Sequence, residues 1–312
     1  MVLSYPPGAF SQSVRQRYRA LASNQVLVIV EGDSDRRTLL PLLGDNVVLV
    51  PAGGRDALLD TYSRLEKAAL DRCLYIVDCD NDFSNELKGR ANLIITSHRD
   101  IEADALFDLE GYDRLAFEYL DYGSASAEEL MARKDELLSF AAGISSRFGV
   151  VKDAARKRGL RLKLRDAFTN AKVRSTPADL PSIGSWVAAQ KIPTLNEIAF
   201  ELGRLMSWSN PDIIDVAQEA GARWNDPCRR HGLPGCGECR LRTSCNGHDL
   251  VATLAVDLSI RLTTQVTSAE LDRHLRMSTN RDLVHRWTVG KRISGWENEI
   301  HLGVLRRRRS AP

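Results

Sequence analysis

The sequence lacks any apolar run near the roughly 20 residues that a membrane span needs. Its first 20 residues also lack the apolar core of a signal peptide, so we expect a cytoplasmic protein without membrane association. Net charge is low, at +2 over 312 residues. The protein as a whole is therefore not a polycation, and any contact with nucleic acid must come from local basic clusters. There is no repeat of fixed period and no low-complexity segment beyond the arginine-rich end.

Cysteine is scarce, with six in the chain, and four of them are concentrated in one short stretch. That set, spaced C-x7-C-x2-C-x5-C, is Cys228, Cys236, Cys239 and Cys245. In a reducing cytosol such a cluster suggests a metal rather than disulfides, and four thiolates match a structural Zn²⁺ site. An iron–sulfur cluster and thiols without metal are the alternatives. A metal would tie the loop-rich segment 225–247 to the helices on either side.

Short apolar runs separated by helical patterns are what the first third of the chain does contain. Such runs are typical of buried strands in a parallel sheet, and here they are 25–30, 46–51, 73–77 and 91–96. We therefore predict an α/β fold with a mostly parallel four-stranded sheet at 25–115, after a lead-in at 1–24.

The rest of the chain, 116–312, has the apolar spacing of helices and predicts a mainly α-helical domain that includes the cysteine segment. The expected helices are 127–140, 148–157, 195–206, 211–222, 248–262, 268–277 and 280–287.

Carboxylates end two of the predicted strands. Glu31 follows the first run, and Asp78 and Asp80 follow the third. Because the carboxyl ends of parallel strands share one edge, we expect these acids to converge. Clustered carboxylates repel one another unless a cation lies between them, which predicts a Mg²⁺ or Mn²⁺ site. Asp82 is a candidate fourth ligand.

Two further residues extend this site. Glu102 begins the helix after the fourth strand, on the same edge, and is a candidate for a second ion or for a general base. Lys88 is a candidate for contacting phosphate, although a plain surface position is the simpler interpretation. The structural alternative for any of these acids is a helix cap or a solvated loop, and that is how we interpret Asp33, Asp35, Asp56 and Asp100.

Three motifs in order resemble the TOPRIM domain of topoisomerases, primases, OLD-type nucleases and some RNA-maturation ribonucleases. They are Glu31-Gly32 after a strand, Gly53-Gly54 in the turn after the next, and Asp78-Cys79-Asp80 after the third. The resemblance covers about residues 25–110. It implies a Mg²⁺-dependent site that makes or breaks phosphodiesters, with Glu31 as acid/base and the two aspartates as metal ligands.

Longer segments of the sequence resemble one particular group of TOPRIM proteins. VEGDSDRRTLLPLL, YIVDCDND, HRDIEADAL and NGHDLVATLA are similar to compact TOPRIM proteins encoded beside ABC-type ATPases, such as the effectors of PARIS-type phage-defence systems. This resemblance implies a toxic nuclease that an ATPase partner restrains, with RNA, tRNA among the candidates, favoured over DNA. A homodimer is also plausible. Basic residues of the second half would hold nucleic acid, with Arg161, Lys163 and Arg165 as candidates.

Two non-catalytic alternatives stay open. A phosphoacceptor of the receiver type also has acids after strands one and three, and Thr96 ends the fourth run where a receiver has Thr or Ser. Against it, the first run ends in Glu-Gly rather than paired acids, and no fifth strand ending in lysine is evident. The other alternative is a TOPRIM fold that only binds a partner.

Overall fold

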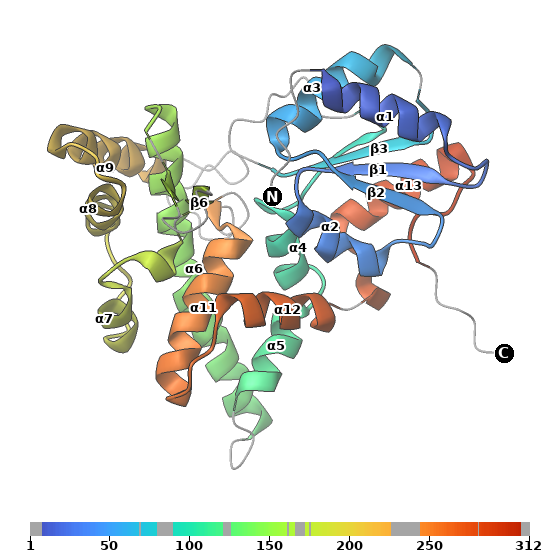
Figure 1. Cartoon of the computed structure of the whole chain (residues 1–312). Coiled ribbons are helices and arrows are strands. Elements are labelled where there is room, and N and C mark those ends of the chain that lie inside the picture. Colours follow the sequence, from blue (N-terminus) through green and yellow to red (C-terminus); the bar gives the residue numbers. More distant parts are fainter. Residues whose placement is uncertain are drawn as a thin grey trace. The chain divides into compact units, whose positions relative to one another are not determined.

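The computed structural model describes residues 8–68, 70–79, 90–120, 126–160, 162–165, 172–174, 176–225, 244–279 and 281–306. They form two compact units (Figure 1). One unit combines Met1–Gly111 with Thr279–Pro312, and the other is Tyr112–Ser278.

A four-stranded, all-parallel sheet forms the centre of the first unit, as the apolar runs predict. The strands are β1 (Val26–Val30), β2 (Val47–Pro51), β3 (Cys73–Val77) and β4 (Leu93–Ile95), in the order β2-β1-β3-β4. At its carboxyl end β1 pairs Val30 with Pro51 on one side and with Ile76 on the other. The residues that follow β1 and β3 therefore become neighbours.

Helices cover both faces of this sheet, which gives a Rossmann-like α/β layering. Along β1, Val28 faces one apolar core and Leu27 faces the other, because successive side chains of a strand point to opposite faces. The helices α2 (Asp33–Leu39), α4 (Ile101–Phe107) and α13 (Thr288–Ile300) line the core that contains Val28. On the opposite face lie α1 (Ala9–Arg19) and α3 (Arg55–Leu65) (Figure 1).

Both ends of the described chain belong to this unit, unlike the predicted division into 1–24, 25–115 and 116–312. Phe10 of the predicted lead-in is buried in the core on the α1 face. From the C-terminal segment 279–306, Trp287 and Trp296 are buried in the other core. The Arg292 guanidinium donates to the Leu93 carbonyl at 2.9 Å, which occupies a polar group of the outermost strand.

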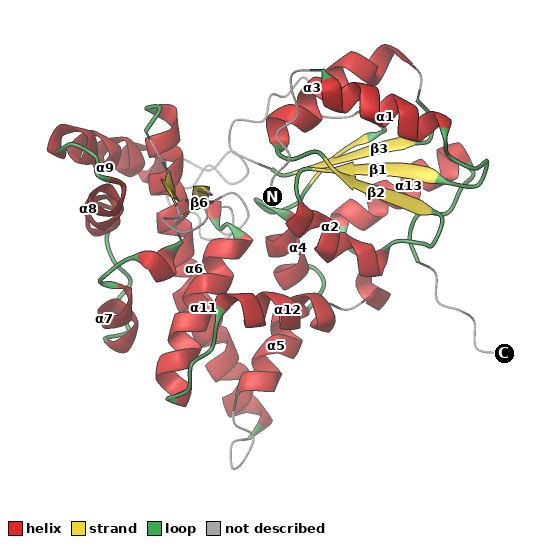
Figure 2. Cartoon of the chain, viewed as in Figure 1, coloured by secondary structure: helices red, strands yellow, loops and turns green. Residues whose placement is uncertain are grey.

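The second unit is mainly helical, as predicted (Figure 2). Its central helix is α6 (Ala127–Lys157), against which α8 (Leu195–Met206), α9 (Asn210–Asn225) and α11 (Gly247–Leu262) pack. Its elements are α5 (Gly111–Tyr119), α6, β5 (Lys163–Arg165), β6 (Lys172–Arg174), α7 (Ile183–Ala188), α8 (Leu195–Met206), α9 (Asn210–Asn225), α11 (Gly247–Leu262) and α12 (Ser268–Ser278). The strands β5 and β6 form a small antiparallel pair.

Two helix predictions need correction. The segments 127–140 and 148–157 are parts of one 31-residue helix, α6. Buried Ala141 and Ala142 carry the helix through this region, where packing outweighs the low helix propensity of Gly143. Of the predicted helix 280–287, the described residues 281–287 form a short 3-10 turn followed by a loop, and the helix begins only at Thr288.

Among the helices in the described part of the chain, none has the length and apolarity that a membrane crossing requires.

Candidate functional site

The carboxyl edge of the sheet brings Glu31 and Asp78 together, although 47 residues separate them. Glu31 directly follows β1 and Asp78 directly follows β3. The backbone N–H of Asp78 donates to Oε1 of Glu31 at 2.9 Å. The expected convergence of these two acids is therefore confirmed.

The Gly53-Gly54 turn after β2 lies at the same edge of the sheet and is hydrogen-bonded to Glu31. The N–H of Gly54 donates to the Glu31 carbonyl at 2.8 Å. Gly53 and Gly54 have φ of 85° and 138°, values that side chains disfavour. A Cβ on Gly54 would meet no atom within 4 Å. At Gly54 the glycine is therefore required by backbone conformation and not by a close approach to neighbouring atoms.

Glu102 joins the cluster from the first turn of α4. Its side chain is almost fully buried, and the Ser34 hydroxyl at the start of α2 donates to its carboxylate. Two more acids adjoin the cluster, Asp35 and Asp100. The carboxylate of Asp35 accepts from the Gly32 N–H at 2.9 Å, and Asp100 caps α4 by accepting from the Ala103 N–H at 2.8 Å.

Sequence reasoning interpreted Asp35 and Asp100 as helix caps or solvated loop residues. Each does accept a helix-terminal N–H, but each also contributes negative charge near Asp78. The signal that could have revealed this is position: both lie within the first turn after a strand end, on the carboxyl edge.

The electrostatic consequence is concentrated on Asp78. Although part of the residue reaches solvent, desolvation raises the pKa of its carboxyl well above the ordinary value of 3.8. Four neighbouring carboxylates raise it further, in the order Asp35, Glu31, Asp100 and Glu102. A bound cation would offset this repulsion between the carboxylates and favour the charged form of Asp78.

The donor set fits Mg²⁺ in kind, because hard divalent cations prefer carboxylate oxygens. The spacing is looser than a closed metal cage. Within the described residues, one group alone offers three ligand atoms within 4.8 Å of one another, and it is His98, Asp104 and Asp108. An ion at Glu31 and Asp78 would therefore depend on water or substrate oxygens to complete its shell, as Mg²⁺ commonly does.

The His98 group is better explained as a structural clamp than as a metal site. Oδ1 of Asp104 accepts from the backbone N–H of His98 at 2.6 Å and lies 2.8 Å from its ring Nδ1. Oδ2 accepts from the Ser97 N–H at 3.1 Å and from the Trp287 indole at 3.0 Å. Four N–H donors fill the roughly four lone-pair sites of a carboxylate, which leaves none for a metal.

Several predicted site residues lie outside the described residues. They are Asp80, Asp82, Lys88, Arg161, Cys228, Cys236 and Cys239. Lys163 and Arg165 form part of β5 in the second unit, where the description covers the backbone alone.

Cys245 is the one member of the cysteine set within the described residues. It is fully buried just before the N-cap of α11, and its Sγ lies 3.4 Å from the Ser145 hydroxyl of α6. This position is compatible with a loop tied to flanking helices, but one thiol does not define a metal site.

The basic end of α6 is largely neutralised by acids. Lys152 is buried and contacts both Asp249 oxygens, at 2.9 and 3.1 Å. Lys157 pairs with Glu219 and Arg158 with Asp215. These three charges are engaged within the second unit, so they offer less for binding phosphate than their number suggests.

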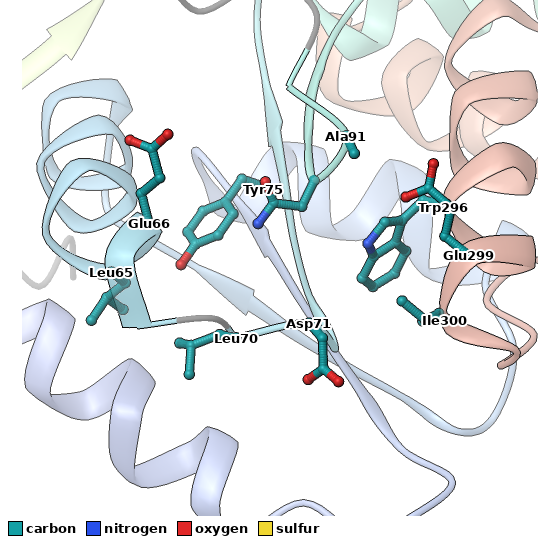
Figure 3. Close-up of a pocket in the computed structure, with 10 residues that line it drawn as sticks. Leu65, Glu66, Leu70, Asp71, Tyr75, Ala91, Trp296, Glu299 and Ile300 are labelled. Carbon is teal, nitrogen blue, oxygen red and sulfur yellow. The ribbon is translucent and has the colours of Figure 1, made fainter.

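A separate cavity of about 350 Å³ lies at the opposite, amino edge of the sheet (Figure 3). Asp71 and Asn92, which precede β3 and β4, line it together with Trp296 of α13. Of its acids, Glu66 pairs with Arg90, and Asp71 accepts from the Tyr18 hydroxyl. It is thus distinct from the acidic cluster at the carboxyl edge.

No protein-family model matches the chain, and no curated protein shows significant similarity to it.

Proposed function

We propose that this chain is a metal-dependent nuclease of the TOPRIM type, with its site at the carboxyl edge of the parallel sheet. The observation that carries the proposal is the convergence of Glu31, Asp78 and Glu102 there. Glu31 and Glu102 both raise the pKa of the Asp78 carboxyl, and carboxyl groups with strongly shifted pKa values are concentrated at functional sites.

Each residue has a role in this proposal. Glu31, fixed by the Asp78 N–H, acts as the acid/base that moves the proton of the attacking water. Asp78, with Asp80 and Asp82, supplies oxygen ligands to the ion. Glu102 binds a second ion or acts as a general base. When bound, Mg²⁺ stabilises the charge that develops on the phosphate and polarises water.

RNA, with tRNA among the candidates, is the proposed substrate in preference to DNA. Lys88, Arg161, Lys163 and Arg165 are the proposed contacts to its phosphates. The proposed biological setting is that of a toxic anti-phage effector under the control of an ABC-type ATPase, with a homodimer as the proposed assembly. These elements rest on the sequence resemblance. A structural Zn²⁺ or an iron–sulfur cluster at the four cysteines completes the proposal, and metal analysis of the purified protein distinguishes the two.

The receiver alternative has less support. In the described part of the sheet β4 is an edge strand, and Arg292 binds its Leu93 carbonyl where a fifth strand would pair. The Thr96 hydroxyl is already engaged, because it donates to the His98 carbonyl and accepts from the Cys79 N–H.

The test is cleavage of labelled tRNA, other RNA and DNA in Mg²⁺ or EDTA, with and without the cognate ATPase. Wild type should cleave only with metal, and Glu31→Gln should lower the rate by about 10²-fold or more. Asp33→Asn is the matched control, because Asp33 is an exposed acid two residues away that pairs with Arg36. Cleavage that survives EDTA, or that Glu31→Gln leaves intact, contradicts the proposal.

A further inference from the structure

A buried carboxylate with no part in the proposed chemistry lies beside the acidic cluster. Asp104 is fully buried on α4, two residues after Glu102. Its four donors come from two places far apart in the sequence: the loop at 97–98 and the indole of Trp287. Trp287 lies 183 residues away, just before α13.

The 97–98 loop is in turn bonded to the loop that carries Asp78. The Thr96 hydroxyl donates to the His98 carbonyl at 2.7 Å. The same hydroxyl accepts from the Cys79 N–H at 2.8 Å. One residue earlier, the Asp78 N–H donates to Glu31.

These contacts form a continuous path, which we call the Trp287 relay. It runs from Trp287 to Asp104, then to His98 and Thr96, and ends at the Asp78–Cys79 loop. It links the loops after β3 and β4, and through the Asp78 N–H it reaches the residue after β1.

We propose that Asp104 and Trp287 are positioning residues for the acidic cluster, and that the C-terminal segment 279–306 is thereby part of the site. Neither residue touches the reacting atoms. They hold the backbone from which Asp78 and Glu31 project. The expected effect on nuclease activity rests on the proposed function. The expected effect on the order of the Asp78–Cys79 loop does not.

The environment of Trp287 explains why one hydrogen bond matters. Trp287 is 2% exposed, so its indole N–H has little access to water and needs a protein acceptor. Asp104 is equally inaccessible, and losing a donor would leave one of its buried oxygens undersatisfied. The segment itself is anchored, because Leu305 pairs with Leu43 and the Val304 and Leu305 N–H groups bind Glu297.

Amide hydrogen exchange of Trp287→Phe tests the relay. Phenylalanine keeps an aromatic ring but removes the N–H, so the Cys79 amide should exchange about tenfold faster, as the loss of a hydrogen bond to a charged group implies. The amide of Leu27, in the sheet core, reports global opening and should change less. Thr96→Val, which removes the middle hydroxyl, should accelerate the Cys79 amide as well.

Trp296→Phe is the matched control. Trp296 is also buried in the same core, but its indole has no bond to Asp104. Equal acceleration at Cys79 in both tryptophan variants, or no acceleration in Trp287→Phe, overturns the inference. If Trp287→Phe does not fold, the result for Thr96→Val decides the matter.

A second readout separates this inference from the proposed nuclease. If wild type cleaves, Trp287→Phe should need about tenfold more Mg²⁺ for half-maximal rate, and Trp296→Phe should not. Cleavage with an unchanged Mg²⁺ requirement and unchanged exchange refutes the relay alone. Faster exchange at Cys79 with no cleavage by any variant refutes the nuclease and leaves the relay standing.

Discussion

Among the residues of the acidic cluster, Asp78 is the one whose charged form the folded protein clearly disfavours. Its carboxyl has a raised pKa because it is desolvated and lies near four other carboxylates. Between the ordinary value of 3.8 and the raised native pKa, the folded state holds a proton that the unfolded state has lost. The stability contributed by this group is therefore present at low pH and is lost as pH rises through that window.

We expect Asp78→Asn to stabilise the protein at neutral pH in EDTA. The gain should raise Tm by roughly 2–4 °C for each kcal/mol of repulsion removed, and it should vanish below the unfolded-state pKa. Thermal unfolding at several pH values, with Asp33→Asn as the control, measures it. If the Asn variant is less stable than wild type at neutral pH in EDTA, the Asp78 carboxylate stabilises the fold, and repulsion from its neighbours does not dominate.

For single residues, the sequence predicts where a side chain lies in the fold better than it predicts the groups to which that side chain bonds. Glu31 and Asp78 could be placed because each follows an apolar strand, and parallel strands end on one edge. The bond from the Trp287 indole to Asp104 could not be predicted, because no local pattern links residues 183 positions apart. Asp35 was missed for a different reason: a carboxylate in the first turn of a helix has a capping role that already accounts for it.

The element that sequence reasoning placed least well is α13. Its segment falls after a run of helices, and neither Trp287, just before the helix, nor Trp296 within it indicates from the sequence which core it enters. The sheet strands were easier, because a five-residue buried run such as Val26–Val30 is apolar throughout. Contacts between distant segments decide where an amphipathic helix packs, and these are absent from its own pattern.

Two glycines of α13 offer a matched test of this placement. A Cβ on Gly290 would overlap the Val284 carbonyl oxygen, whereas a Cβ on Gly295 would meet nothing within 4 Å. Gly290→Ala should destabilise the first unit by about 2 kcal/mol or more, since the neighbour is backbone and cannot simply rotate away. Gly295→Ala should instead stabilise it by up to about 1 kcal/mol through helix propensity.

Denaturant unfolding followed by exchange at core amides of β1 and β3 measures both glycine variants. Equal stability of the two would mean that α13 does not pack as described. Destabilisation confined to the second unit would mean that the segment 279–306 belongs to that unit.

At the scale of the whole molecule, the described residues begin and end in one unit, and the helical unit is inserted between them. Composition and periodicity predicted the α/β and helical parts, but they could not reveal that the chain returns to its first unit after Ser278. In the described residues the acidic cluster belongs entirely to that first unit, and so does the relay that we assign to its support. The four-cysteine metal site and the nucleic-acid contacts of the second unit stay predictions.

Whether the acidic cluster binds a divalent cation is tested most directly by calorimetric titration of Mn²⁺ into the metal-free protein. Wild type and Asp33→Asn should bind Mn²⁺ saturably, while Glu31→Gln and Asp78→Asn should bind at least about tenfold more weakly, because each removes one carboxylate charge from the cluster. No saturable binding by wild type, or equal binding by all four proteins, would contradict a metal site at this edge of the sheet.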